Sequence, residues 1–222
     1  MDSAEDEGQC EGKGEVMKEL ALHIMDIIQN SLTAGSLNID VDVYTCDEDR
    51  FLDIAVCDDG CGMDEKTLNQ AADPFHTSRK TRDVGLGIPM FREAAIMSGG
   101  NFAIKSEPGA GTELRCRFLN RSVDRQPLGE LGNVVFLNML SNEGVRFRLH
   151  LASSRGEYSF DSREFAASIC EKGGSFMDAA FDAELCINEK TEAIFGGILP
   201  EMGGELFGAE RNNKTDKRQA AV

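Results

Sequence analysis

Three polar side chains early in the chain have the spacing of a single helix face. His23, Asp26 and Asn30 follow one another at intervals of three and four residues. On a helix they would fall within about 60° of arc. A carboxylate can act as a general base, and an amide oxygen is a suitable ligand for Mg²⁺. A solvated helix face would show the same polar stripe, so the stripe alone leaves both interpretations open.

Three glycine-containing turns follow this stripe along the chain. Asp58-Asp59-Gly60-Cys61-Gly62 comes directly after an apolar, strand-like run, where glycines let the backbone approach a ligand closely. Val84-Gly85-Leu86-Gly87 opens a predicted helix, whose first N–H groups favour phosphate. Gly109-Ala110-Gly111-Thr112 separates two predicted strands. Each turn alone is compatible with a structural role, so only the combination is informative.

Taken in order, these segments resemble the GHKL superfamily of histidine kinases, type II topoisomerases, heat-shock chaperone ATPases and mismatch-repair ATPases. Residues 26–35 resemble its N box, 58–62 its first glycine box, and 85–87 and 109–112 its second and third. Asp73-Pro74-Phe75-His76-Thr77 resembles the F box of histidine kinases. This resemblance implies an ATP-binding domain of the Bergerat type.

The resemblance also implies a role for each matched residue. Asn30 would ligate the Mg²⁺ that bridges the phosphates of ATP, and Asp58 would accept a hydrogen bond from the adenine amino group. Thr112 would support the adenine pocket beside Asp58. The other implied nucleotide-binding residues are Gly60, Gly62, Met63, Thr77, Val84, Gly85, Leu86 and Gly87.

Asp26 stands where hydrolytic members of the superfamily carry a glutamate, four residues before the asparagine. An aspartate can supply the general base on a shorter stem, or it can hydrogen-bond a water on the Mg²⁺. Sensor histidine kinases also carry a phospho-accepting histidine on a separate pair of helices. None of His23, His76 and His150 has that context. A kinase activity would therefore act on another protein, as in the anti-sigma-factor kinases.

The elements around these motifs predict an α+β fold. A helix over 15–34 precedes a two-stranded hairpin, and a short helix capped by Asp64 runs to about residue 72. A third helix over 86–98 precedes two more strands. This order predicts a two-layer α/β sandwich, with helices on one face of a mostly antiparallel sheet. We expect the ATP-binding domain to span 15–120, after a disordered acidic segment at 1–14.

A small C-terminal α/β appendage is expected over residues 121–198, followed by a flexible tail at 199–222. Residues 131–140 are apolar and leave helix and strand open. The whole chain also resembles small bacterial ATP-binding proteins that are often encoded beside iron hydrogenases. That resemblance includes Arg125-Gln126-Pro127-Leu128-Gly129 and the 160–164 region. Neither segment carries a motif of known chemistry, and docking and homodimer formation are both open.

The net charge of the chain limits the classes of partner that it can bind. With a net charge of −16 and a pI near 4.6, the surface repels nucleic acids and anionic membranes. No apolar run approaches the roughly 18 residues of a membrane span, and the acidic N-terminus lacks the features of a signal peptide. We therefore expect a cytoplasmic protein. The seven cysteines are irregularly spaced, which favours buried thiols over a metal site.

Two functions remain in competition. The first is a slow Mg-ATP-dependent ATPase or protein kinase that acts on an unidentified protein partner. The second is a non-catalytic module that senses ATP and reports it to such a partner. A DNA machine of the mismatch-repair or topoisomerase type is disfavoured by the negative charge and the short chain.

Overall fold

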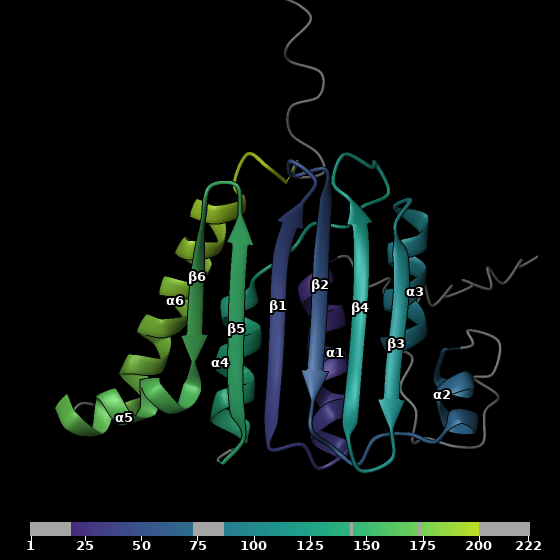
Figure 1. The fold of residues 1–222 in the computed structure, drawn as a ribbon. Helices are drawn as coiled ribbons and strands as arrows, with labels where there is room; N and C mark the ends of the chain where they lie inside the picture. The colour runs from purple at the N-terminus through teal and green to yellow at the C-terminus, as the bar shows by residue number, and fades with distance from the viewer. Residues whose placement is uncertain (1–18, 73–86, 143, 173–174, 200–222) are drawn as a thin grey trace, which may run out of the picture.

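A computed structural model describes residues 19–72, 87–142, 144–172 and 175–199 of the 222-residue chain. Within these residues six strands form one sheet in the order β3-β4-β2-β1-β5-β6 (Figure 1). The strands are β1 (Asn38–Cys46), β2 (Phe51–Asp58), β3 (Asn101–Glu107), β4 (Gly111–Leu119), β5 (Arg146–Ser153) and β6 (Gly156–Asp161). The helices are α1 (Leu20–Thr33), α2 (Glu65–Ala72), α3 (Gly87–Met97), α4 (Leu131–Ser141), α5 (Ser162–Lys172) and α6 (Phe176–Phe195).

The sheet is antiparallel at every junction except the one between β1 and β5, which run parallel. This confirms the predicted α+β class and the mostly antiparallel sheet. The parallel register pairs Asn38 with Arg146 and continues to Tyr44 opposite Ala152. The C-terminal strands thus extend the sheet that contains the nucleotide motifs. The division into two units near residue 120 remains a prediction, and the sheet runs across it.

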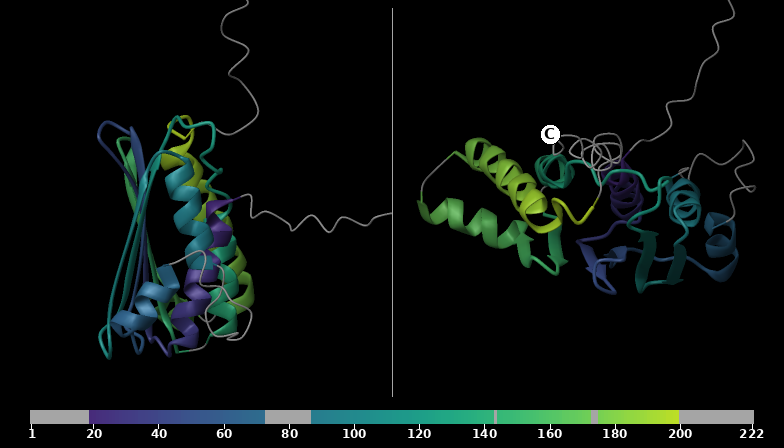
Figure 2. Two further views of the ribbon diagram at one scale, coloured as in Figure 1. Left: turned by 90° about the vertical axis from the view of Figure 1, so that its right-hand side faces the viewer. Right: turned by 90° about the horizontal axis from the view of Figure 1, so that it is seen from above.

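Helices α1, α3, α4 and α6 cover one face of the sheet, as the side view in Figure 2 shows. The strict alternation of apolar residues along β1 explains this layer. Ile39, Val41 and Val43 point into the core and are buried, whereas the residues between them lie on the other face. Each buried aliphatic side chain contributes roughly 1.5–3 kcal/mol. The predicted two-layer sandwich is therefore confirmed.

Residues 131–140, for which the sequence left helix and strand open, lie in helix α4. Its periodicity is weak because it packs against α6 and lies beside α1 and β5, so it buries residues on several sides. A Cβ on Gly132 would lie 2.3 Å from the Glu184 carbonyl oxygen, which shows how closely α4 and α6 cross. None of the described helices combines the length and apolar character that crossing a bilayer requires.

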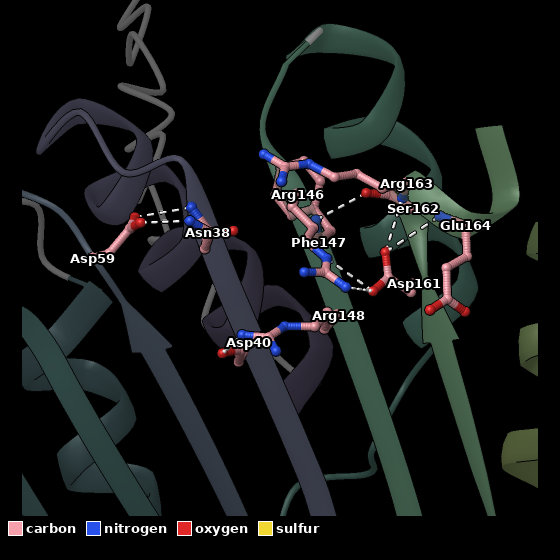
Figure 3. A network of polar contacts seen from close by, with 10 residues as sticks. All are labelled: Asn38, Asp40, Asp59, Arg146, Phe147, Arg148, Asp161, Ser162, Arg163 and Glu164. Atoms are coloured by element: carbon pink, nitrogen blue, oxygen red, sulfur yellow. Dashed lines mark hydrogen bonds and ion pairs between the residues drawn. The ribbon is translucent and has the colours of Figure 1, made fainter. Parts of the chain in front are cut away.

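The open face of the sheet carries ion pairs that join the strands (Figure 3). Arg148 pairs with Asp40 across the parallel junction between β1 and β5. Arg146 Nε donates to Asp161 Oδ2 at 2.8 Å, from β5 to the end of β6. These pairs help to attach the C-terminal strands to β1.

Candidate functional site

Asp58, the last residue of β2, is held by three donors that reach both carboxylate oxygens. Ser31 Oγ donates to Oδ2 at 2.7 Å, whereas Ser36 Oγ and the Gly60 N–H donate to Oδ1 at 3.1 Å and 2.9 Å. Ser31 and Ser36 are buried, so these bonds are shielded from water. Because Oδ2 has a single donor in the described structure, it keeps a lone pair that can accept a hydrogen bond from a ligand.

The loop after β2 approaches the start of β4 so closely that two positions require glycine. Gly62 has φ 66°, and a Cβ there would lie 1.9 Å from the Glu107 carbonyl oxygen. Gly111 has φ 91°, and its Cβ would lie 1.9 Å from the Asp58 carbonyl oxygen. The first and third glycine turns of the sequence are therefore in contact, next to the carboxylate of Asp58.

Thr112 lies directly opposite Asp58 in the register of β2 and β4. Its Oγ1 is 2.9 Å from Ser106 Oγ, and Ser106 Oγ accepts a hydrogen bond from the Met63 N–H at 2.8 Å. Met63 is half-buried and packs against the edge of the core. The structure thus gathers one set of predicted site residues at this end of the sheet, namely Asp58, Gly60, Gly62, Met63 and Thr112.

Asp26 lies on α1 against the first residue of α3. A Cβ on Gly87 would lie 2.7 Å from Asp26 Cβ and 3.1 Å from Asp26 Oδ2. The missing side chain therefore lets the N-terminus of α3 approach the carboxylate. Asn30 follows Asp26 by one turn on the same side of α1. The structure brings Asp26, Asn30 and Gly87 into one neighbourhood. Outside the described residues lie Thr77, Val84, Gly85 and Leu86.

His23 is 1% exposed, so the interpretation of the polar stripe as a solvated face is wrong for this residue. Its ring stacks on Phe91 of α3, with centroids 5.3 Å apart and planes 9° apart. Its Nε2 lies 2.9 Å from Gln126 Oε1. Burial lowers the pKa of His23, although Gln126 and the charge of Asp26 oppose that shift. The ring is therefore neutral at pH 7.

The carboxyl group of Asp26 is half-buried. Burial raises its pKa above the usual range, and the nearby His23 opposes that rise. A carboxylate with a raised pKa is a stronger base, which is the property that general-base catalysis on water requires.

Asn30, one helical turn after Asp26, supplies an amide oxygen that can act as a metal ligand. It is half-buried, and its amide forms no hydrogen bond with any residue in the described ranges. Mg²⁺ takes few protein ligands and keeps several waters, so the residues present fit a Mg²⁺ held by Asn30. The described residues contain no group of three or more His, Cys, Asp or Glu suited to a metal ion. A Mg²⁺ here would depend on Asn30, on waters and on the phosphates of a nucleotide.

Three hydroxyl groups that sequence reasoning missed organise the Asp58 end of the site: those of Ser31, Ser36 and Ser106. Ser31 directly follows Asn30, and Ser36 follows the glycine that ends the first helix. Serine is common at such positions, and Asp58 is 27 and 22 residues away from these two along the chain. Local patterns therefore carried no clear signal for their contact with Asp58.

Two further hollows lie apart from these residues. One, of about 430 Å³, is on the open face of the sheet, where its lining includes Asp42 and His150. The other, of about 480 Å³, lies between residues 125–130 and α6. Neither is lined by a residue of the predicted nucleotide site.

Residues 14–122 match the family of histidine kinase-, DNA gyrase B-, and HSP90-like ATPases. The matched segment includes Asp26, Asn30, Asp58, Gly87 and Thr112. The chain therefore carries a domain of this family, and the resemblance to the GHKL superfamily is confirmed. The resemblance to proteins encoded beside iron hydrogenases remains a prediction.

Curated relatives of this segment are much longer proteins. A putative sensor protein of Shewanella frigidimarina is 32% identical over 99 residues, which cover 43% of this chain and 15% of that protein. Histidine protein kinase DivJ of Caulobacter vibrioides is 29% identical over 98 residues, 42% of this chain and 16% of the kinase. DNA mismatch repair protein MutL of Halobacterium salinarum is 36% identical over 94 residues, 40% of this chain and 14% of MutL.

Among solved structures, the Aquifex aeolicus MutL ATPase domain complexed with ADP aligns with 77% of this chain and 70% of its own length. The sequence identity is 16% and the TM-score is 0.42.

Proposed function

We propose that this protein binds Mg-ATP between α1, α3 and the Asp58 end of β2, and uses it as a slow ATPase or as a kinase for a partner protein. The observation that carries this proposal is the fixed carboxylate of Asp58, with its open lone pair, inside an ATPase-family domain. An adenine amino group is a donor that such an acceptor recognises. Thr112, Gly60, Gly62 and Met63 would complete the adenine end.

The phosphate end would lie along Asn30 and the start of α3. Asn30 would hold Mg²⁺, which neutralises phosphate charge and orients the γ-phosphate when bound. The first N–H groups of a helix have no partner within the helix, so the N-terminus of α3 would offer N–H groups and a partial positive charge to an anion. Gly85, Leu86 and Gly87 would supply these N–H groups, and Thr77 and Val84 would contribute to the same end. Such local donors are needed because the net charge of −16 opposes a polyanionic ligand.

Asp26 would act as the general base. It would accept a proton from the attacking water, or from a hydroxyl of the partner protein, while that oxygen bonds to the γ-phosphorus and ADP leaves. Its half-buried position and raised pKa support this role. We expect the partner to be a cytoplasmic protein, because the strongly negative surface disfavours nucleic acids and anionic membranes.

The substitution Asp26→Asn tests this assignment. We expect Mg-ATP turnover to fall by roughly a hundredfold or more, the usual size of a general-base contribution, while ATP affinity is retained. Asp42→Asn is a matched control, because Asp42 is a half-buried carboxyl with a raised pKa on the open face of the sheet. Unchanged turnover in Asp26→Asn, measured by phosphate release, would sink the base assignment.

The second candidate function is a non-catalytic ATP sensor. The aspartate at position 26 favours it, because its stem is shorter than that of the glutamate in hydrolytic relatives. Saturable ATP binding without hydrolysis or phosphoryl transfer, measured with the true partner present, would identify the protein as a sensor.

A further inference from the structure

Residues 125–129, here called the strap, cross the N-terminal end of α1. The N–H groups of Leu20 and Ala21 donate to the carbonyl oxygens of Pro127 and Leu128 at 2.9 Å and 2.8 Å. The first N–H groups of a helix have no partner within the helix, so the strap satisfies two of them. It replaces a capping side chain, because Glu19 makes no side-chain cap hydrogen bond.

The strap is fixed on the protein by its own buried residues. Arg125 is 1% exposed, and its guanidinium donates to the carbonyl oxygens of Asn120 at 3.1 Å and Gln126 at 2.8 Å. Leu128 is buried and belongs to the hydrophobic core. The strap is therefore a defined surface against which α1 is placed.

One side chain of the strap reaches past the cap to the interface between α1 and α3. Gln126 Oε1 lies 2.9 Å from His23 Nε2. An amide oxygen only accepts, so Nε2 carries the proton of the neutral ring. This bond fixes the plane of an imidazole that stacks on Phe91 with a 9° angle between the rings.

The His23–Phe91 contact and the Asp26–Gly87 contact lie one turn apart between the same two helices. His23 precedes Asp26 by three residues on α1, and Phe91 follows Gly87 by four residues on α3. The spacing of α1 and α3 at the stacked rings therefore determines how close Asp26 lies to the start of α3.

We infer that Gln126 and His23 are positioning residues for the phosphate end of the nucleotide site. The strap fixes His23, the stacked ring sets the separation of α1 and α3, and that separation places Asp26 and Asn30 relative to Gly87. The adenine end depends less on this separation, because Asp58 lies on β2 and is also held by Ser36 Oγ and the Gly60 N–H, outside the two helices. This inference rests on the proposed binding of Mg-ATP.

The test compares two ligands on the full-length protein. Gln126→Ala removes the acceptor for His23 and leaves the backbone carbonyls of the strap in place. Val123→Ala is the control, because Val123 is 69% exposed two residues before the strap. Dissociation constants are measured by calorimetry for Mg-ATP and for adenosine. We expect Gln126→Ala to weaken Mg-ATP about fivefold, the effect of one hydrogen bond, and to change adenosine less than about twofold.

His23→Phe keeps an aromatic ring against Phe91 without the bond to Gln126. We expect it likewise to weaken the binding of Mg-ATP more than that of adenosine. An equal loss of Mg-ATP and adenosine affinity would indicate general destabilisation and overturn the inference. Unchanged Mg-ATP affinity in both variants would also overturn it. If the wild-type protein binds adenosine but not Mg-ATP, it has no phosphate end to position, and the inference is wrong. If it binds neither ligand, the proposed function itself is contradicted.

Discussion

Gly87 and Asp26 touch where α3 begins, since a Cβ on Gly87 would lie 2.7 Å from Asp26 Cβ. The contact joins the second glycine turn to the helix that carries the N-box residues. It also explains the requirement for glycine at position 87, because the atom that a side chain would meet is the Cβ of Asp26, which cannot rotate away. The close approach of two helices thus places a carboxylate beside a helix N-terminus.

Gly87→Ala should force α1 and α3 apart at this contact. We expect a loss of about 1–3 kcal/mol in the free energy of unfolding, as for other overpacked sites, together with weaker Mg-ATP binding. Urea denaturation and calorimetric titration measure the two effects. Gly109→Ala is a useful comparison for local strain alone, because a Cβ on Gly109 meets no atom within 4 Å, although its φ is 78°. Wild-type affinity in Gly87→Ala would contradict the placement of phosphate at this contact.

Ser31→Ala should lower both stability and ATP affinity, because the Ser31 hydroxyl holds the carboxylate of Asp58. The substitution removes the 2.7 Å bond to Asp58 Oδ2, and we expect it to cost about 1–3 kcal/mol of stability and to lower ATP affinity. Thr33→Ala is the matched control, because Thr33 is exposed and donates only to the Gln29 carbonyl on the same helix. Equal effects of the two substitutions on ATP affinity would show that Ser31 has no specific role at Asp58.

Asp59→Asn tests whether Asp59 has a structural role that differs from the binding role proposed for the adjacent Asp58. Asp59 accepts a hydrogen bond from the backbone N–H of Leu37 at 2.7 Å. It also accepts from the backbone N–H of Asn38 at 2.8 Å and from Asn38 Nδ2 at 2.6 Å, as Figure 3 shows. These contacts fix the start of β1. We expect a loss of about 1 kcal/mol in stability, measured by chemical denaturation, with ATP affinity unchanged. A large loss of affinity in this variant would show that Asp59 belongs to the binding site.

His23→Gln should reduce the loss of stability on mild acidification. Burial lowers the pKa of His23 in the folded chain below its ordinary value of 6.5, so the unfolded chain binds more protons as the pH falls below that value. The contribution is present above pH 6.5 and is lost as the pH falls toward the lowered pKa. Urea unfolding at a series of pH values from about 7 to about 5 measures this dependence. A wild-type slope in His23→Gln, with His150→Gln as the control, would contradict the burial of a neutral ring.

The order of elements near the motifs was predictable because it depends on local patterns. The alternation of Ile39, Val41 and Val43 predicts β1, and the structure confirms it. The assignment of Asp58, Asn30 and the glycines to one pocket came from the resemblance, since each motif alone is weak. Their roles toward a nucleotide stay predictions, and the structure contributes the contacts that join them.

Other features could not be predicted, because they depend on residues far apart in the chain. The parallel pairing of β1 with β5 joins Asn38 to Arg146, and no local pattern specifies such a register. His23 was expected on a polar stripe, yet it is buried and its hydrogen-bond partner Gln126 is 103 residues away. Helix α4 was ambiguous because burial on several sides removes the periodicity that distinguishes helix from strand.

The central claim is that Asp58 and Asn30 hold the two ends of Mg-ATP. Calorimetric titration of the full-length protein with ATP, with and without Mg²⁺, tests it most directly when wild type is compared with Asp58→Asn. We expect saturable binding by wild type that is tighter with Mg²⁺. We expect the affinity for ATP to fall at least about tenfold in Asp58→Asn, because the asparagine amide has a single acceptor oxygen where the aspartate has two. Absence of binding by the folded wild type, or equal affinity in the two proteins, would contradict the account.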